Sequence, residues 1–310
     1  MIDVRRLRVL CEVARYGSFS GAAAALGYTQ PAVSRQISTL EAEVGAMLVR
    51  RVPKGAVLTD AGRLLVDRGE AILARLDDAE SELRELAGVS GGRLRIASFA
   101  SAAASIIPPA IAQFRGRHPA VELSIVMLDP AYSLPQLIAG ELDMALSHDA
   151  DLEVGGASGD LEIVHLFDDP MYVAMPAGHP LADASELDLA DFAGEPWMLA
   201  TTHTCPDSRL FLRACHAAGF EPKIAFQHDD YPAILGFVAA GVGVAVIPDM
   251  VARGVRTDVV VRALHRPPPP RPIMVALPAG YRSPAAAAML EILREIGDAW
   301  VAERPALAAA

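Results

Sequence analysis

The sequence is poor in cysteine and aromatic residues, and it has no long apolar run. Three cysteines among 310 residues exclude a disulfide-stapled scaffold and fit a reducing compartment. The longest nearly apolar run, residues 237–248, is far shorter than a membrane span. The first six residues contain no apolar segment typical of a secretory signal. We therefore expect a cytoplasmic protein that does not associate with membranes.

Glycine and proline are not enriched either. The chain has 24 glycines and 23 prolines, too few for a fibrous or low-complexity protein. Hydrophobic residues make up 52% of the chain, which excludes a disordered protein. Because single cores rarely grow beyond about 250–300 residues, the length predicts about two domains.

The charge is unevenly distributed along the chain. The net charge of −11 taken alone argues against nucleic acid as a partner. However, residues 1–65 contain nine basic and five acidic residues, whereas the remaining 245 contain 18 basic and 33 acidic ones. This segregation predicts a basic contact module followed by an acidic body.

The first 45 residues have the pattern of three helices. Asp3 is a good N-cap for a first helix that ends at Gly17, and Ser18 or Ser20 can cap a short second one. Gly27 suits a left-handed turn before a third helix, which Thr29 would cap. In that helix the apolar residues recur at inward-facing spacing, namely Val33, Ile37 and Leu40. Five polar or small residues are left outside or at the margins: Gln30, Ala32, Ser34, Arg35 and Ser38.

This arrangement is typical of a helix-turn-helix DNA reader. Gln and Arg bond base edges in the major groove, and Ser and Thr reach phosphates or bases. Residues 48–58 follow as two short β-prone stretches around a Pro-Lys-Gly turn, which predicts a hairpin wing with three cations that contact phosphates. A helical bundle with a solvated basic loop is the alternative that the pattern alone leaves open.

A family resemblance rests on these same residues. The segments from Phe19 to Ala23, Thr29 to Ile37, Leu48 to Arg51 and Leu58 to Gly62 closely resemble the winged helix-turn-helix of LysR-type transcriptional regulators. The resemblance implies that residues 1–59 form a domain that binds double-stranded DNA. The implied DNA contacts are Ser20, Thr29, Gln30, Pro31, Ala32, Ser34, Arg35, Arg50, Arg51 and Lys54.

Residues 60–88 have the pattern of a long helix with a coiled-coil seam. Leu65, Ile72, Ala79 and Leu86 are seven residues apart, and Leu76 and Leu83 fall between them. An amphipathic helix packed on its own chain is the alternative. The resemblance implies a linker helix that forms a homodimer, and beyond it a homotetramer.

From residue 93 onward, strands and helices alternate as in an α/β domain. The pattern predicts a helix over 102–117 and a last helix at 283–299 that returns to the first subdomain. Pieces such as Gly140 to Asp143 and Gly241 to Pro248 resemble the effector-binding region of LysR-type regulators, similar in fold to periplasmic binding proteins. The resemblance implies two lobes, lobe I at about 93–161 and 268–300 and lobe II at about 168–260, joined by connecting segments at 161–168 and 259–268. Together these features predict an α plus α/β chain.

The resemblance implies a small, anionic effector between the two lobes. Helix N-termini that point into such a cleft offer free N–H groups to an anion. The expected effector residues are Ser101, Leu128, Thr201, Thr202 and His203, with Asp229 or Asp230 at the rim. Leu128 stands where family members often have Thr, which favours a bulkier or less polar effector. An ordinary helix cap or loop hydroxyl is the alternative for each polar residue.

Other functions fit the sequence less well. Cys205 and Cys215 resemble the cysteine pair of peroxide-sensing members, which makes a redox-sensing regulator the main alternative; a buried core cysteine is the simpler interpretation of Cys215. A solute-binding protein or an enzyme is a remote alternative, because we find neither an export signal nor a catalytic set. We expect no catalytic residues, no metal site and no cofactor.

Overall fold

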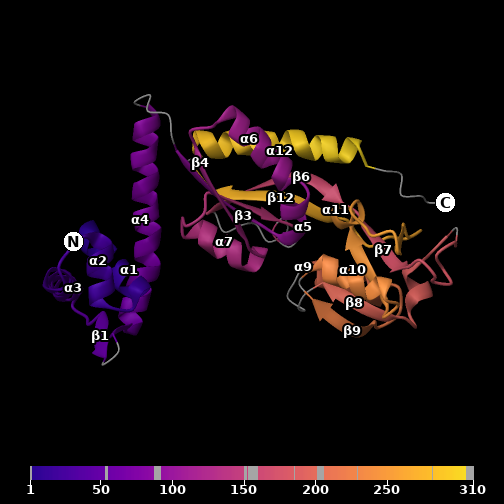
Figure 1. Cartoon of the computed structure of the whole chain (residues 1–310), viewed down its shortest axis with the longest axis horizontal. Coiled ribbons are helices and arrows are strands. Elements are labelled where there is room, and N and C mark those ends of the chain that lie inside the picture. Colours follow the sequence, from indigo (N-terminus) through magenta and orange to yellow (C-terminus); the bar gives the residue numbers. More distant parts are fainter. Residues whose placement is uncertain are drawn as a thin grey trace. The chain divides into compact units, whose positions relative to one another are not determined.

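The computed structural model describes residues 2–52, 55–86, 92–149, 152, 160–184, 186–200, 206–228, 230–280 and 282–304. The chain divides into two compact units. The first comprises Met1–Gly92 with Gln136–Leu142, and the second comprises Arg93–Pro135 with Asp143–Ala310. Figure 1 shows both units, with most of their helices and strands labelled.

Three helices open the first unit: α1 (Val4–Tyr16), α2 (Phe19–Leu26) and α3 (Gln30–Val44). The Asp3 carboxylate accepts a hydrogen bond from the Arg5 N–H at 2.8 Å, so Asp3 caps α1 as predicted. Of the two candidate caps for α2, Ser18 is the one that accepts, from the Gly21 N–H. Thr29 occupies the N-cap position of α3, but its side chain makes no capping hydrogen bond, which corrects that prediction. Pro31 lies in the first turn of α3, where its missing N–H costs nothing.

The core of this unit confirms the inward face predicted for α3. Val33, Ile37 and Leu40 are buried together with Leu10 of α1 and Leu48 before the wing. Fully burying each of these side chains contributes about 1.5–3 kcal/mol. The opposite side of α3 is thereby left toward solvent.

The predicted wing is present as an antiparallel hairpin of β1 (Val49–Val52) and β2 (Gly55–Leu58). One carboxylate oxygen of Glu41 in α3 accepts hydrogen bonds from the backbone N–H groups of Leu48 and Val49, at 2.8 and 3.1 Å. Glu41 therefore fixes the wing to α3. The long helix α4 (Asp60–Leu86) follows, and its first turn is capped by Thr59 Oγ1, which accepts from the Gly62 N–H.

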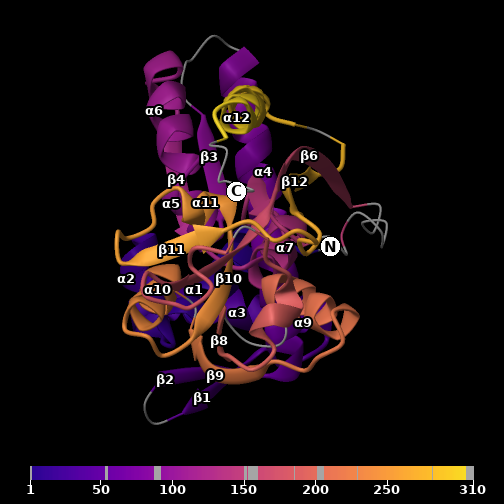
Figure 2. The ribbon, with the colours of Figure 1, turned by 90° about the vertical axis from the view of Figure 1, so that its right-hand side faces the viewer.

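The second unit contains two five-stranded sheets, each the centre of one lobe (Figure 2). The lobe I sheet has the order β4 (Glu122–Met127), β3 (Arg93–Ser98), β5 (Met144–Ser147), β12 (Arg271–Pro278), β6 (Leu161–Asp169). The lobe II sheet has the order β11 (Val259–Arg262), β7 (Met171–Pro176), β10 (Val244–Pro248), β8 (Pro196–Ala200), β9 (Lys223–His228). Strands β3, β4 and β5 are parallel, while β12 runs antiparallel to both of its neighbours.

Helices cover both sheets. In lobe I, α5 (Ala100–Ala104), α6 (Ile107–Arg117) and α12 (Pro284–Ala302) bury one apolar core with the sheet, which includes Phe114 and Leu290. The last helix thus returns to lobe I as predicted. In lobe II, α9 (Pro206–Ala217) with the 3₁₀ turn η1 (Leu189–Phe192) packs in one cluster and α10 (Tyr231–Ala239) in another. The short α11 (Asp249–Ala252) follows β10, and α7 (Pro130–Ile138) follows β4.

Three predictions about this unit are corrected by the structure. The helix expected over 102–117 is two helices, because Pro108 and Pro109 start a new helix rather than continue the old one. Residues 161–168 are not a connector, since β6 pairs with β12 along its whole length. The segment 259–268 likewise begins as β11, paired with β7. The lobes are therefore joined at Pro170 and at residues 263–270.

Candidate functional site

The helix-turn-helix presents a polar face on α3. The side chains of Thr29, Pro31 and Arg35 are exposed, as are Ser20 in α2 and Arg50 in the wing. Gln30, Ala32 and Ser34 are partly exposed on α3. Lys54 and the side chain of Arg51 lie outside the described residues. The expected DNA contacts that are described are therefore exposed or partly exposed, whereas Val33, Ile37 and Leu40 are buried.

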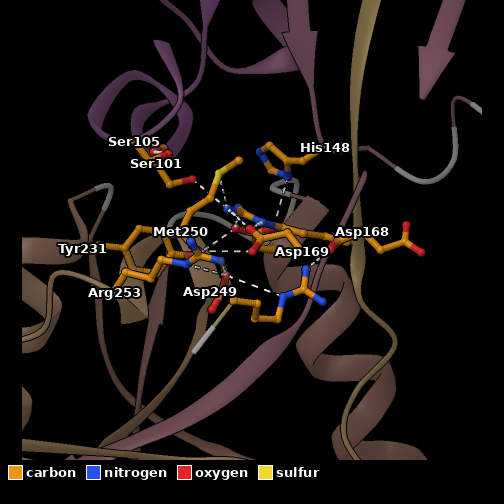
Figure 3. Close-up of polar contacts among 12 residues, drawn as sticks. Ser101, Ser105, His148, Asp168, Asp169, Tyr231, Asp249, Met250 and Arg253 are labelled. Carbon is orange, nitrogen blue, oxygen red and sulfur yellow. Dashed lines mark hydrogen bonds and ion pairs between the residues drawn. The ribbon is translucent and has the colours of Figure 1, made fainter. Parts of the chain in front are cut away.

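A buried cluster of charged and polar side chains lies between the two lobes. We call it the interlobe cluster; its members are Ser101, His148, Asp169, Asp207, Tyr231 and Arg271. Figure 3 shows Ser101, His148, Asp169 and Tyr231 directed toward a common centre. Ser101, His148, Asp169 and Arg271 belong to lobe I, and Asp207 and Tyr231 belong to lobe II.

Arg271 is the centre of the interlobe cluster. It is the first residue of β12, directly opposite Asp169 at the end of β6. Its Nε donates to Asp169 at 2.9 Å, its Nη1 to Asp207 at 2.8 Å and its Nη2 to the Ser101 hydroxyl at 2.7 Å. The side chain is only 2% exposed. One guanidinium therefore joins two segments of lobe I to the first turn of α9 in lobe II.

The two carboxylates around Arg271 have opposite pKa shifts. Burial acts to raise the pKa of Asp207, but Arg271 and His148 outweigh it and hold that pKa well below its usual range. Burial raises the pKa of Asp169, and the nearby Arg271 offsets only part of this effect. For Arg271 itself, burial opposes the charge, but Asp207 and Asp169 overcome it and raise the pKa. Asp207 is thus the carboxylate that the surroundings hold ionised.

A second contact between the lobes lies near the end of α12. Arg253, at the end of α11, donates to the backbone carbonyl of Trp300 at 2.6 Å and covers the indole ring at 3.8 Å. The same guanidinium bonds the buried Asp249 carboxylate at 3.0 Å. Figure 3 shows Asp249 and Arg253 beside the interlobe cluster. A cation on an aromatic face adds attraction to this contact.

The expected effector residues have different outcomes. Ser101 lies within α5, not before a helix, and its buried hydroxyl accepts from Arg271. The backbone N–H of Leu128 donates to Ser98, while Asp230 stands exposed before α10. Thr201, Thr202, His203 and Asp229 lie outside the described residues. Of the expected effector residues that the structure describes, Ser101 alone belongs to the interlobe cluster.

Sequence reasoning missed Arg271, Asp169 and Asp207, which organise this site. A signal was available for Arg271, because a lone arginine between Pro270 and Pro272 starts an otherwise apolar strand. A charge in such a place needs a buried partner. Nothing local in the sequence indicates which acids supply it.

The surroundings of Cys215 do not favour the redox alternative. Cys215 is fully buried in the core of lobe II, and burial raises the pKa of its thiol to about 12. Since the thiolate is the reactive form, Cys215 is a poor nucleophile in this state. Cys205, its proposed partner, lies outside the described residues.

None of the helices among the described residues is long and apolar enough to cross a membrane.

A winged helix-turn-helix with a polar face, joined to a two-lobed α/β domain, defines a DNA-binding regulator of transcription with an effector-binding domain. The family model for the bacterial regulatory helix-turn-helix protein of the lysR family matches residues 4–63. The LysR substrate binding domain matches residues 87–298. The chain therefore belongs to the LysR family.

Relatives agree with this assignment. The chain is 30% identical over 298 residues to the probable HTH-type transcriptional regulator LrrA of Synechococcus elongatus, covering 95% of this chain and 97% of that protein. It is 26% identical over 266 residues to the transcriptional regulator AlsR of Bacillus subtilis, covering 86% of each. Both relatives are named as transcriptional regulators.

Solved structures show the same fold. The LysR family regulator CbnR has a TM-score of 0.70 at 22% identity, covering 96% of this chain and 99% of that one. Full-length CbnR complexed with its target DNA has a TM-score of 0.71 at 23% identity, covering 95% and 100%.

Proposed function

We propose that this protein is a cytoplasmic homo-oligomer that binds a two-fold promoter site and responds to a small anionic effector between its lobes. The observation that carries the proposal is the accessible polar face of α3 beside a basic wing. Arg35 and Gln30 would contact base edges, and Arg50 would contact phosphates. An effector that prefers one arrangement of the lobes would shift the oligomer between two DNA-bound geometries.

A small pocket lies at the interlobe cluster, where we propose that the effector acts. His148, Asp149, Asp207 and three arginines, Arg209, Arg213 and Arg271, are among its lining residues. Its volume of ≈ 30 Å³ leaves room for a few water molecules at most. A larger effector therefore requires the two lobes to move apart or the pocket wall to change.

Binding to promoter DNA tests the central claim. We expect the purified protein to shift a fragment from upstream of its own gene and to protect two half-sites in a footprint, because a dimer reads related half-sites. Random DNA of equal length is the control. Binding of both fragments with equal affinity at low and moderate salt would contradict a promoter-specific regulator.

The dimer contact is proposed at α4. Ile72 and Leu76 are 47% and 40% exposed although they lie on the predicted coiled-coil seam. Leu64 is also exposed but lies off that seam. Burying Ile72 and Leu76 against a second copy of the helix would give each side chain the apolar contact it lacks here.

We expect the double change Ile72→Asp and Leu76→Asp to weaken the dimer by about a thousandfold or more, because four apolar side chains per dimer lose burial. Sedimentation over a range of concentrations measures this. The matched control is Leu64→Asp, which should leave the dimer intact. If both variants stay dimeric, the contact lies elsewhere.

A further inference from the structure

We propose that Asp207 is a built-in carboxylate ligand that occupies the anion site between the lobes and holds them together without an effector. The inference rests on the proposed function, since it concerns the site at which we expect the effector to act. It implies that an anionic effector must displace Asp207 from Arg271. The effector would then separate the lobes instead of bringing them together.

The Asp207 carboxylate meets groups of both lobes: Oδ2 is hydrogen-bonded, whereas Oδ1 lies near His148 without a hydrogen bond. Oδ2 accepts from Arg271 at 2.8 Å and from the Tyr231 hydroxyl at 2.9 Å. Oδ1 lies 3.1 Å from Nδ1 of His148. Asp207 is also in the first turn of α9, where the helix dipole favours a negative charge. A free carboxylate bound here would meet the same set of groups.

Arg271 also has partners within lobe I. Its Nε donates to Asp169 and its Nη2 to the Ser101 hydroxyl, so this hydroxyl is already paired with the guanidinium. The interlobe cluster therefore places two carboxylates around one arginine. A further carboxylate that binds Arg271 would have to replace one of them, because uncompensated buried charge is costly.

Of the two carboxylates, Asp207 is the one whose replacement would change the contact between lobes. Asp169 is paired with Arg271 across neighbouring strands of the same sheet, and its Oδ1 accepts from the Met250 N–H. Asp207 belongs to the opposite lobe, and its carboxylate contacts Arg271 and His148 across the junction between the lobes. Because it is attached to the chain, its effective concentration at the site far exceeds that of a free small acid.

Removal of the Asp207 carboxylate should therefore create a site for a small free acid. In the full-length protein, we expect Asp207→Ala to lower the Tm by about 10 °C, because Arg271 loses one buried partner. We expect sodium formate to raise the Tm of this variant by several degrees and that of the wild type by no more than sodium chloride does. Formate is the probe because it is the smallest carboxylate.

Asp258→Ala is the matched control, because Asp258 pairs with Arg256 on the surface and neither lines the pocket at the interlobe cluster. It should lose little stability and show no formate response. Equal formate responses of Asp207→Ala, Asp258→Ala and wild type would overturn the inference. Asp207→Asn tests it without a cavity: the loss of charge should lower the Tm clearly more than Asp258→Asn does, and equal Tm values would overturn it as well.

The two proposals fail in different ways. If the wild type does not bind its promoter specifically, the proposed function is contradicted, whatever effect formate has on the Tm. A missing formate response with intact promoter binding contradicts only the role of Asp207.

Discussion

Replacement of Arg271 by alanine is expected to destabilise the two-lobed domain by about 3–5 kcal/mol, since the interlobe cluster then loses the guanidinium that pairs with both of its carboxylates. Among the described residues, Asp169 and Asp207 both take their ion pair with an arginine from Arg271. Each would remain buried without this partner, and Asp207 would keep the neighbouring His148. Chemical denaturation of the full-length protein, followed through the tryptophans of the domain, measures the loss.

The pH dependence gives this prediction a second readout. In the wild type the depressed pKa of Asp207 means that its stabilising effect is present above pH 4 and is lost as pH falls below the usual Asp range. In the variant, burial acts on both carboxylates without the opposing cation, so both pKa values rise. A buried carboxylate with a raised pKa lowers the stability as pH increases and the group becomes charged. We therefore expect the variant to gain stability as pH falls from about 7 to 5.

Arg282→Ala is the control for the loss of an arginine. Arg282 bonds Glu162 at 2.7 Å, but this pair is partly exposed and is expected to be worth about 1 kcal/mol or less. Equal losses in the two variants, or a stability of the Arg271 variant that does not change with pH, would show that the interlobe cluster does not hold charge as inferred.

Local sequence patterns predicted the helix-turn-helix well. The spacing of Val33, Ile37 and Leu40 indicated the buried face of α3, and Ser18 and Asp3 indicated helix starts, because caps and periodicity depend on residues a few positions apart. Thr29 occupies its predicted position without the predicted bond. Capping preference therefore located the helix start but did not determine the rotamer.

The interlobe cluster could not be predicted in the same way. Arg271 meets partners that lie 64, 102 and 170 positions away in the sequence. Periodicity carries no information on such pairings, which follow from the order of strands in the sheet and from the junction of two lobes. The resemblance pointed to Ser101 but could not show that its hydroxyl is already paired with an arginine of this chain.

The second large effect is expected at the DNA-binding face. Arg35→Ala should weaken binding to the promoter site by about 10- to 100-fold, because a bidentate contact to a base is worth about 1–3 kcal/mol. Binding to random DNA should change far less. Arg50→Ala should instead weaken both, and it should reduce the slope of log K against log salt by about one, because a phosphate contact releases counterions whatever the sequence.

Arg115→Ala is the matched control, since it removes the same charge from an exposed position in α6 of lobe I. It should leave both affinities and the salt slope unchanged. Comparison of Arg35→Ala with Arg50→Ala separates a base contact from a phosphate contact, which net charge alone cannot do. If Arg35→Ala lowers binding to random DNA as much as binding to the promoter, Arg35 contacts phosphates, and specificity must come from other residues of α3. If Arg115→Ala has the same effect as Arg50→Ala, the wing makes no phosphate contact of its own and the whole surface charge accounts for the salt dependence.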